Sequence, residues 1–329
     1  TPFCCLCPMW GCEMNQTVTR RKCVGALSGI VFFGQWVRGQ TTHGPVGWAS
    51  VGKGTTGGMG GSVSVVSDQA ALAKAAKGDK PGVIKVMGEI RLSDSVRIGS
   101  NKTITSTGLG AGLTGAGLNV RSASNVIISH LAIRGAKPDG ISIEEGSTHV
   151  WVDHCDLSDC ADGLLDIKRG SDLVTVSWCR FHHHHKTSLV GHSDADSAKK
   201  TDSGKLRVSY HHNLFDGTVS RHPRVRFAET VHVFNNHFRG VSHGVHSSMD
   251  AGVLVEGNYF EKVDYPTHTV FGKSPRPGRL VERDNIYSGC AHKPEVAGTI
   301  REPSLSYAYT LDKAESIPEM LKGRAGVRG

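Results

Sequence analysis

Apolar and polar residues alternate in short stretches along most of this chain, and such alternation is typical of β-strands. One stretch of eight residues recurs seven times between residues 126 and 287. The recurring stretches begin at Val126, Val150, Val174, Val208, Val231, Val253 and Leu280. The steps between these starts are 24, 24, 34, 23, 22 and 27 residues. Because one such unit cannot bury its apolar face alone, this spacing predicts strands stacked on copies of themselves in a solenoid.

Two positions of the repeat carry side chains that suit stacking. Five residues after each start the chain has Leu131, Cys155, Cys179, Asn213, Asn236, Asn258 and Asn285. Four asparagines in register predict a ladder in which each side-chain amide bonds to the next. Two residues further, an apolar column runs through Ile133, Leu157, Phe181, Phe215, Phe238, Phe260 and Tyr287. These columns favour an all-β, single-domain, right-handed parallel β-helix over an antiparallel β-sandwich, which does not explain asparagines in register.

Cys155 and Cys179 occupy the asparagine column on neighbouring coils. Strands about 4.8 Å apart place such a pair within reach of a disulfide, and two stacked buried thiols fit the same positions. The sequence leaves both alternatives open.

A helical segment, "DQAALAKAAK", stands before the repeats. Ser67 is the expected N-cap, and a helix is predicted from about Asp68 to Lys77. There it would cap the open end of the solenoid, which otherwise exposes unpaired strand edges. At the other end, residues 303–329 are expected to form a loosely attached tail.

The first 39 residues differ in composition from the rest of the chain. Read from Met14, a basic group precedes an apolar stretch at 24–33, and small residues precede Gln40. This order is typical of a secretory signal peptide. A cysteine-rich metal knuckle is disfavoured because paired C-x₂-C spacing is missing. The expected divisions are residues 1–13 upstream of the native protein, 14–39 as signal peptide, 40–302 as β-helix domain and 303–329 as C-terminal tail.

Composition adds a mild preference for anionic partners. Lysine and arginine number 38 against 30 aspartate and glutamate residues, a formal net charge of +8, which favours polyanions without selecting one. The 41 glycines indicate many turns. No apolar run approaches the length of a membrane-spanning helix, so no membrane partner is expected.

The 34-residue step carries an insertion at residues 182–205, and an enlarged turn of a solenoid commonly carries function. It begins with four histidines, but neighbours in an extended chain point to opposite faces, so these side chains are not expected to share one metal ion. Asp162 and Asp166 lie one coil after Asp139, where stacking would bring their carboxylates together as hard ligands for Ca²⁺. The same aspartates are equally compatible with Asp-Gly turns.

Positive charge gathers at residues 219–226, "VSRHPRVR", where three arginines surround one proline. A nucleic-acid patch, a site for an acidic sugar and a solvated face all fit such a cluster on composition alone. Nucleic acid is the weakest of these interpretations, because the aromatic residues occupy core columns and leave no stacking platform.

Two longer motifs connect these features. Residues 150–194, which contain "VWVDH" and "DGLLDIKRGSD", together with "RHPRVRF" at 221–227 resemble the pectate lyases of polysaccharide lyase family 1. Residues 47–61, "GWASVGKGTTGGMGG", resemble the mature N-terminus of that family, and the resemblance extends over about residues 45–290. It implies a right-handed parallel β-helix, secretion, and Ca²⁺-dependent β-elimination of polygalacturonate.

The resemblance also implies roles for individual residues. Arg221 corresponds to the catalytic arginine, and Lys186 and Arg226 correspond to residues that bind the substrate carboxylate. The calcium ligands correspond to Asp139, Asp162 and Asp166. Two departures stand out. Family members often have two acids where "AKPDGISI" offers only one, which leaves a fourth calcium ligand unidentified, and "AE" at 228–229 stands where a glycine is common.

The implied chemistry explains why cations gather here. Removing the weakly acidic C5 proton of a galacturonate leaves an enolate-like dianion, which cations stabilise as it forms. Arg221 would accept that proton. An isolated guanidinium stays protonated up to about pH 12, so neighbouring cations must favour its neutral form, and activity at alkaline pH is expected. Pro223 permits a bend that brings Arg221 and Arg226 to one side, while Arg224 is expected to point elsewhere and to be structural.

Two other functions remain open at this stage. A pectin lyase would act on methyl-esterified chains without calcium and would not need the aspartates. A non-catalytic β-helix would bind polyanions without cleaving them. A monomer is expected for each of these functions.

Overall fold

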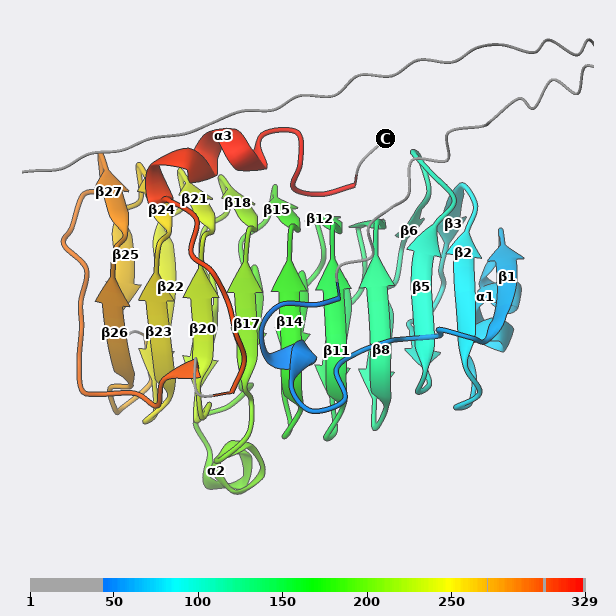
Figure 1. Cartoon of the computed structure of the whole chain (residues 1–329), viewed down its shortest axis with the longest axis horizontal. Coiled ribbons are helices and arrows are strands. Elements are labelled where there is room, and N and C mark those ends of the chain that lie inside the picture. The colour runs from blue at the N-terminus through cyan, green and yellow to red at the C-terminus, as the bar shows by residue number, and fades with distance from the viewer. Residues whose placement is uncertain (1–43, 271, 304–305, 328–329) are drawn as a thin grey trace, which may run out of the picture. The chain divides into compact units, whose positions relative to one another are not determined.

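The computed structural model describes residues 44–270, 272–303 and 306–327. Within these ranges the chain winds into three sheets, and successive coils lie side by side along the solenoid in Figure 1. Strands pair in parallel with their counterparts in the coils before and after. The predicted all-β parallel β-helix is confirmed.

The three sheets are named A, B and C. Sheet A contains β1 (Ser62–Val66), β2 (Gly82–Val86), β5 (Lys102–Ser106), β8 (Ser124–Ser129), β11 (Thr148–Asp153), β14 (Asp172–Ser177), β17 (Val208–His211), β20 (Val231–Phe234), β23 (Gly252–Glu256) and β26 (Arg279–Arg283). Sheet B contains β3 (Glu89–Arg91), β6 (Gly112–Thr114), β9 (Ala132–Arg134), β12 (Asp156–Ser158), β15 (Arg180–His182), β18 (Leu214–Asp216), β21 (His237–Arg239), β24 (Tyr259–Glu261) and β27 (Ile286–Ser288). Sheet C contains β4 (Val96–Ile98), β7 (Leu118–Arg121), β10 (Ile141–Glu144), β13 (Leu165–Ile167), β16 (Ser188–Val190), β19 (Arg224–Arg226), β22 (His243–Ser248) and β25 (Tyr265–His268). The described helices are η1 (Trp48–Ser50), α1 (Gln69–Ala76), α2 (Asp196–Asp202), η3 (Ala314–Ser316) and α3 (Ile317–Leu321).

The repeat starts predicted from the sequence lie in register in sheet A. Val150 pairs with Val126 on one side and with Val174 on the other, and the same register continues to Leu280. These valines are fully buried, so they form the apolar face that no coil buries alone.

The asparagine ladder is also present. The side-chain amide of Asn213 donates to Asn236 at 2.9 Å, and that of Asn236 donates to Asn258 at 3.0 Å. Asn258 continues the ladder to Asn285 at 2.9 Å. Beside it, the buried rings of the phenylalanine column stack with centroids 4.5 to 5.0 Å apart. Buried polar and apolar columns therefore hold the same register.

The sulfur atoms extend this ladder without a disulfide. Cys155 and Cys179 are buried free thiols, and the backbone N–H of Cys155 donates to the sulfur of Cys179 at 3.4 Å. Of the two alternatives left open by the sequence, the structure has the stacked thiols.

Helix α1 covers the first coils, as expected, and packs on β1, β2 and β4. Its Leu72 and Ala76 are fully buried. The cap is Asp68, whose carboxylate accepts the backbone N–H of Ala71 at 2.9 Å, so the expected cap at Ser67 was wrong by one residue. A carboxylate at this position also suits the positive end of the helix dipole.

The C-terminal segment is packed more firmly than expected. Ile317 and Leu321 are almost fully buried, and the N–H of Gly326 donates to the carbonyl of Trp178 at 2.7 Å. The expectation of a loose attachment is therefore wrong for residues 306–327, which cross the solenoid in red in Figure 1. On the same side, η1 is held against sheet A because Trp48 N donates to the Ser209 hydroxyl at 2.9 Å.

No helix in the described ranges is long and apolar enough to cross a bilayer. The predicted signal peptide at 14–39 and the segment before it lie outside the described residues.

Candidate active site

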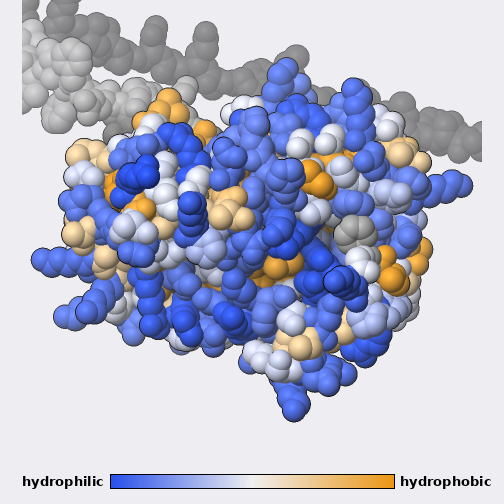
Figure 2. Space-filling model, turned by 180° about the vertical axis from the view of Figure 1, so that it is seen from behind, coloured by the Kyte–Doolittle hydropathy of each residue, from blue (hydrophilic) through white to orange (hydrophobic). Residues whose placement is uncertain are grey.

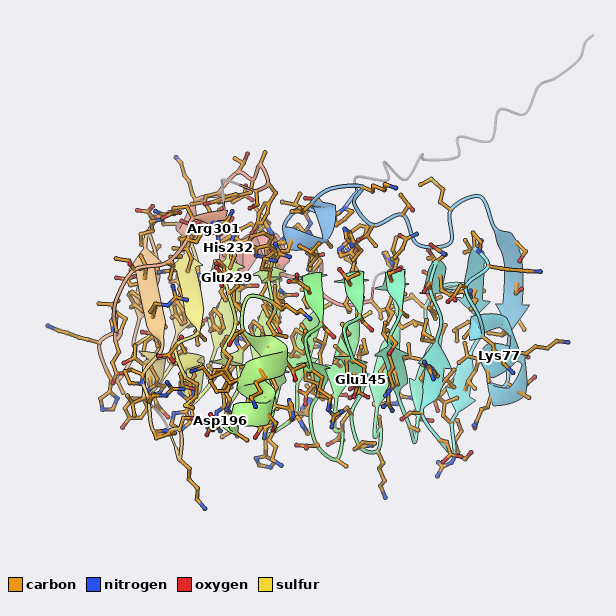
Figure 3. All side chains as sticks on the ribbon, turned by 90° about the horizontal axis from the view of Figure 1, so that it is seen from below. Lys77, Glu145, Asp196, Glu229, His232 and Arg301 are labelled. Atoms are coloured by element: carbon orange, nitrogen blue, oxygen red, sulfur yellow. The ribbon has the colours of Figure 1, made fainter. Side chains whose placement is uncertain are left out.

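The enlarged turn joins β16 of sheet C to β17 of sheet A and contains α2. In Figure 1 this helix projects from the solenoid. In Figure 3 it faces the viewer, with Asp196 at its start. It comprises residues 191–207, whereas the sequence placed the insertion at 182–205. The difference arises because residues 182–190 complete β15 and form β16 as in other coils. Seen from behind, the surface is hydrophilic over most of its area, as a polar substrate requires (Figure 2).

Three of the predicted site residues meet where sheet C begins. Lys186 Nζ lies 3.1 Å from a carboxylate oxygen of Asp162, and Arg221 Nη1 lies 3.5 Å from the same oxygen. Lys186 also forms a parallel β-bridge with Ser220, which fixes the two basic segments side by side.

The backbone of Arg221 has an uncommon conformation. Its φ is +69°, in the left-handed region, which costs a non-glycine residue on the order of 1 kcal/mol or more. Residues that follow strands in other coils, such as His154 and His212, share this conformation, so it belongs to the turns of the solenoid. Here the turn aims the guanidinium of Arg221 at Asp162 and away from the core.

The basic residues line a hollow of about 150 Å³. Its walls are Lys186, Ser220, Arg221, Arg224, His243, Gly244 and His246. A second hollow, of about 510 Å³, shares Lys186 with the first and is lined by Asp159, Cys160, Ala161, His183, His184, His185, Gly217 and Val219. The two hollows therefore adjoin at Lys186, and the arginines line the smaller of them.

Arg226 and Arg224 differ from expectation. Arg226 is buried, with its Nε 2.6 Å from Asp194 and its Nη1 3.1 Å from the carbonyl of Gly191, and it is absent from the walls of the hollow. Arg224, expected to point elsewhere, lines the hollow beside Arg221. The physical reason is that Arg224 and Arg226 share the outer face of β19, while Arg221 belongs to the preceding turn and its direction is not set by strand alternation.

The predicted metal ligands lie on two neighbouring coils. Asp139 accepts the N–H of Gly163 at 3.0 Å, and its other oxygen lies 3.1 Å from Lys168 Nζ. Asp166 is 2% exposed and accepts the N–H of Leu189 at 3.1 Å. Burial, followed by the negative charge of Asp139, raises the pKa of Asp166 to about 7.

These carboxylates fit a divalent cation in their chemistry. A buried carboxyl whose pKa is raised beside a second carboxylate is a place where a bound cation would be stabilised. Gly163 leaves room for this group, because a Cβ there would lie 2.3 Å from Asp166 Oδ1. Asp162, however, faces Lys186 and Arg221, and the three carboxylates do not gather within 4.8 Å of one another.

Lys168 is a residue that the sequence interpretation missed. Its ammonium group lies 3.1 Å from a carboxylate oxygen of Asp139, and its charge offsets part of the repulsion at Asp166. The sequence could have indicated Lys168, because it follows Asp166 by two residues and so lies on the same face of an extended chain.

Two other features are less suited to an anionic sugar. Among the described residues, the group whose potential ligand atoms lie within 4.8 Å of one another is His130, Asp153 and His154. Asp153 already accepts from His154 at 2.5 Å and from Ser177 at 2.6 Å, and the two imidazoles stack in parallel, so their nitrogens do not converge. This group is part of the packing between coils.

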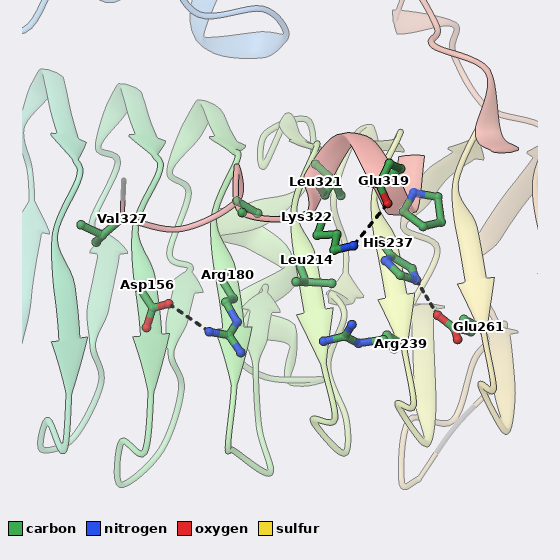
Figure 4. A pocket seen from close by; sticks show the side chains of 13 residues that line it. Asp156, Arg180, Leu214, His237, Arg239, Glu261, Glu319, Leu321, Lys322 and Val327 are labelled. Atoms are coloured by element: carbon green, nitrogen blue, oxygen red, sulfur yellow. Dashed lines mark hydrogen bonds and ion pairs between the residues drawn. The ribbon is translucent and has the colours of Figure 1, made fainter. Parts of the chain in front are cut away.

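The second feature is a hollow of about 570 Å³ between sheet B and the C-terminal segment (Figure 4). Its charges are matched within the wall, as the dashed lines in Figure 4 show. His237 pairs with Glu261 at 3.0 Å, Lys322 pairs with Glu319 at 3.7 Å, and Arg180 lies between Asp156 and Asp216. The smaller hollow beside Arg221 differs because its cations exceed its carboxylates.

Comparison with known proteins shows to which family the chain belongs. The family model described as pectate lyase matches residues 34–328. The chain belongs to the pectate lyase family. Pectate lyase A of Emericella nidulans is 39% identical over 293 residues, covering 85% of each chain, and pectate lyase B of Colletotrichum gloeosporioides is 40% identical over 288 residues, covering 84% of each.

Solved pectate lyases have the same fold. The Bacillus sp. N165 enzyme Bsp165PelA, crystallised with trigalacturonate, matches with a TM-score of 0.77 and 30% identity over 86% of this chain and 99% of that chain. Pectate lyase II from Xanthomonas campestris matches with a TM-score of 0.72 and 26% identity over 86% of this chain and 98% of that one. This chain is therefore a polysaccharide lyase of that family.

Proposed function

We propose that this pectate lyase cleaves de-esterified polygalacturonate by β-elimination and leaves oligogalacturonates with a 4,5-unsaturated end. The observation that carries the proposal is the hollow in which Lys186 and Arg221 meet beside the aspartates of two neighbouring coils. A relative of the same fold was crystallised with trigalacturonate, which supports a galacturonate chain as the substrate.

The residues have distinct tasks in this reaction. Lys186 binds and neutralises the carboxylate of the galacturonate whose C5–H is removed, because negative charge grows on that carboxylate as the proton leaves. Arg221 takes the C5 proton, and the electron pair left behind forms the C4–C5 double bond as the C4–O bond breaks. Its guanidine must be neutral to accept the proton, and Lys186 and Arg224 line the same hollow beside it.

Asp139, Asp162 and Asp166 would hold Ca²⁺, since carboxylate oxygens are the ligands that this ion prefers. Bound there, the ion supplies Lewis-acid stabilisation of charge on the substrate carboxylate. Lys168 would remain beside Asp139 and limit the negative charge of the site. The aspartates favour this function over a calcium-independent pectin lyase, which has no use for buried acids at this place.

The test compares polygalacturonate with fully methyl-esterified pectin, in the presence of calcium and of a chelator. Ultraviolet absorbance reports the unsaturated product. We expect product from polygalacturonate with calcium, loss of it with chelator, and recovery when calcium is returned. Activity on methyl-esterified pectin that survives chelation would assign the chain to the pectin lyases. Binding to polygalacturonate with no rise in absorbance would identify a non-catalytic polyanion-binding protein.

We further propose that the protein is secreted and acts as a monomer. The composition of residues 14–39 supports export. Sequencing the N-terminus of protein recovered from the culture medium tests the cleavage expected before Gln40, and light scattering tests the monomer. Retention of residues 14–39 in the recovered protein would contradict the signal peptide.

A further inference from the structure

We propose that Arg224 binds a carboxylate of the polygalacturonate chain, and that Ser274 and Asp194 hold its guanidinium in the hollow. The inference rests on the proposed function and adds a substrate-binding residue to it. It adds Arg224 to Lys186 and Arg226, the two residues for which the resemblance implies a contact with a substrate carboxylate.

The position of Arg224 in sheet C is fixed by its neighbours. It pairs with Leu189 of β16 and with His246 of β22, and Leu189 pairs in turn with Asp166. Arg224 therefore lies in the same outward column as Asp166, two strands away, which is about 10 Å along the solenoid. A galacturonate chain that runs along sheet C from the acidic pair into the hollow would span this distance.

The guanidinium of Arg224 has spare hydrogen-bonding capacity. Within the described part of the chain its hydrogen bond goes to the hydroxyl of Ser274 at 3.2 Å, and its buried Nε has no hydrogen-bond partner. A buried donor without a partner is unfavourable, and a carboxylate in the hollow would satisfy it. Guanidinium groups also present paired donors that match a carboxylate.

The electrostatic surroundings of Arg224 also favour a bound anion. Burial, followed by the charge of Arg226, lowers the pKa of Arg224 to about 10; Asp194 opposes this shift in part, and Arg221 adds to it. An anion bound beside it would relieve both effects, because it replaces lost solvation and offsets the neighbouring charges.

Arg226 is committed to a different partner. The carboxylate of Asp194 lies 2.6 Å from Arg226 Nε and accepts the hydroxyl of Ser274 at 3.0 Å. Asp194 of the enlarged turn thus contacts Arg226 directly and Arg224 through Ser274.

Arg224 and Arg226 differ in their carboxylate partners. Four cations, Lys186, Arg221, Arg224 and Arg226, stand against two carboxylates, Asp162 and Asp194. Asp162 forms ion pairs with Lys186 and Arg221, and Asp194 forms an ion pair with Arg226. Arg224 reaches Asp194 only through Ser274, and a polyanionic substrate supplies a carboxylate in direct contact.

The experiment measures KM and kcat on polygalacturonate for Arg224→Gln, Arg226→Gln and Arg97→Gln. Arg97 is the matched control, since it lies exposed in the same column of sheet C on β4 and donates to the carbonyl of Arg121 at 3.3 Å. We expect Arg224→Gln to raise KM about tenfold or more, because a hydrogen bond to a charged group is lost, with a smaller change in kcat. Arg97→Gln should leave KM unchanged.

Arg226→Gln should lower the unfolding temperature more than it raises KM, because Arg226 is a buried anchor of the enlarged turn. A folded Arg224→Gln protein with the wild-type KM overturns the proposal, and so does a rise in KM confined to Arg226→Gln. If Arg224→Gln does not fold, Ser274→Ala replaces it. Loss of the Ser274 contact should raise KM while the unfolding temperature stays near that of the wild type, and an unchanged KM counts against the proposal.

The two hypotheses fail in different ways. If the wild type forms no unsaturated product, the proposed function is wrong, and retardation in gels that contain polygalacturonate then tests Arg224 by itself. Weaker retardation of Arg224→Gln than of Arg97→Gln supports a carboxylate-binding role. Equal retardation overturns it.

Discussion

Arg221 combines a left-handed backbone with a guanidinium that faces Asp162 across the hollow. Lysine at this position keeps the positive charge but has a shorter and differently shaped head group. A proton acceptor must reach one point beside C5, so Arg221→Lys is expected to lower kcat by a factor of about 10² or more. Lys186 should keep KM close to the wild-type value. Initial rates of ultraviolet absorbance across a range of polygalacturonate concentrations give both constants.

The control for this variant is Arg97→Lys, which makes the same exchange on the same sheet away from the hollow. Arg224→Lys is unsuitable as a control, although the sequence predicted a structural role for Arg224, because Arg224 lines the hollow. Equal rates for Arg221→Lys and Arg97→Lys would show that the cluster acts only as a basic patch.

Asp166 tests the assignment of the metal ligands. Asp166→Asn keeps the shape of the side chain and its contact with Leu189 while it removes the charge. We expect a folded enzyme that needs more calcium for half-maximal activity, measured by calcium titration of the initial rate. Unfolding of the variant, seen by circular dichroism, would instead favour a turn-forming role for the aspartates.

The sequence could predict the site residues in part. Arg221, Lys186 and Asp162 were placed together by resemblance, and the structure brings them together. The contacts of Arg226 and Arg224 depend on Asp194, which is 32 residues away in sequence from Arg226 and reaches Arg224 through Ser274. Such a pairing between an enlarged turn and a strand has no local pattern, so no reading of nearby residues could reveal it.

At the scale of elements, the asparagine ladder joins the turns of successive coils. Asn236 is fully buried and bonds to Asn213 and Asn258 through its side chain. Asn236→Ala leaves these partners unsatisfied, so it is expected to destabilise the fold by about 1–3 kcal/mol without inactivating the enzyme. Chemical denaturation and the specific activity at low temperature measure the two effects.

Asn285 provides the comparison for the ladder, because it stands at its end and is only partly buried. Asn285→Ala should cost less than Asn236→Ala. The ladder has no energetic role if both variants unfold at the wild-type denaturant concentration.

The turn before β19 contains a buried histidine, His222, whose protonation makes the stability of the fold depend on pH. His222 Nδ1 donates to the carbonyl of His243, so its Nε2 accepts from Thr218 at 2.6 Å and from Thr187 at 3.1 Å, as a neutral ring does. Burial lowers the pKa of His222 to about 3. The unfolded chain binds the proton near pH 6.5, so stability is complete above that pH and is lost as pH falls toward 3.

We therefore expect the unfolding temperature to fall with acidification below pH 6.5 in the wild type, and to fall less steeply in His222→Gln. His185→Gln removes an exposed imidazole and should keep the wild-type slope. Identical slopes for the wild type and His222→Gln would rule out this histidine as a source of acid sensitivity.

Elements could be predicted where one coil repeats the pattern of the last. The valine, asparagine and phenylalanine columns appear in the sequence because stacked parallel strands require like residues at like positions. The N-cap was displaced by one residue, since Ser67 and Asp68 are both good caps and only the structure shows which one accepts the helical N–H.

The whole molecule depends on segments that lie outside the repeat. Helix α3 packs beside β21, and its Leu321 is 1% exposed although no repeat column includes it. Leu321→Ala is expected to destabilise the protein by about 2–5 kcal/mol, because it removes a buried side chain and leaves a cavity. Activity at low temperature should persist, since the candidate site lies on sheet C. Thermal unfolding and initial rates measure both.

Leu109→Ala is the matched control, because Leu109 is 71% exposed and its truncation removes little buried surface. An equal loss of stability in the two variants would contradict a packed C-terminal segment. The sequence could not predict this packing, since residues 306–327 carry no repeat and contact the solenoid only through distant partners.

The enlarged turn at residues 191–207 has a consequence for how such a protein can diversify. The step between Val174 and Val208 is the longest of the repeat, yet the two valines pair in register like those of shorter steps. Extra length is therefore accommodated entirely outside the coil, while Asp194 within it sets the partners of Arg226 and, through Ser274, of Arg224. Natural variation or deliberate loop exchange at this turn can alter which anionic chain is held without any change to the scaffold beneath.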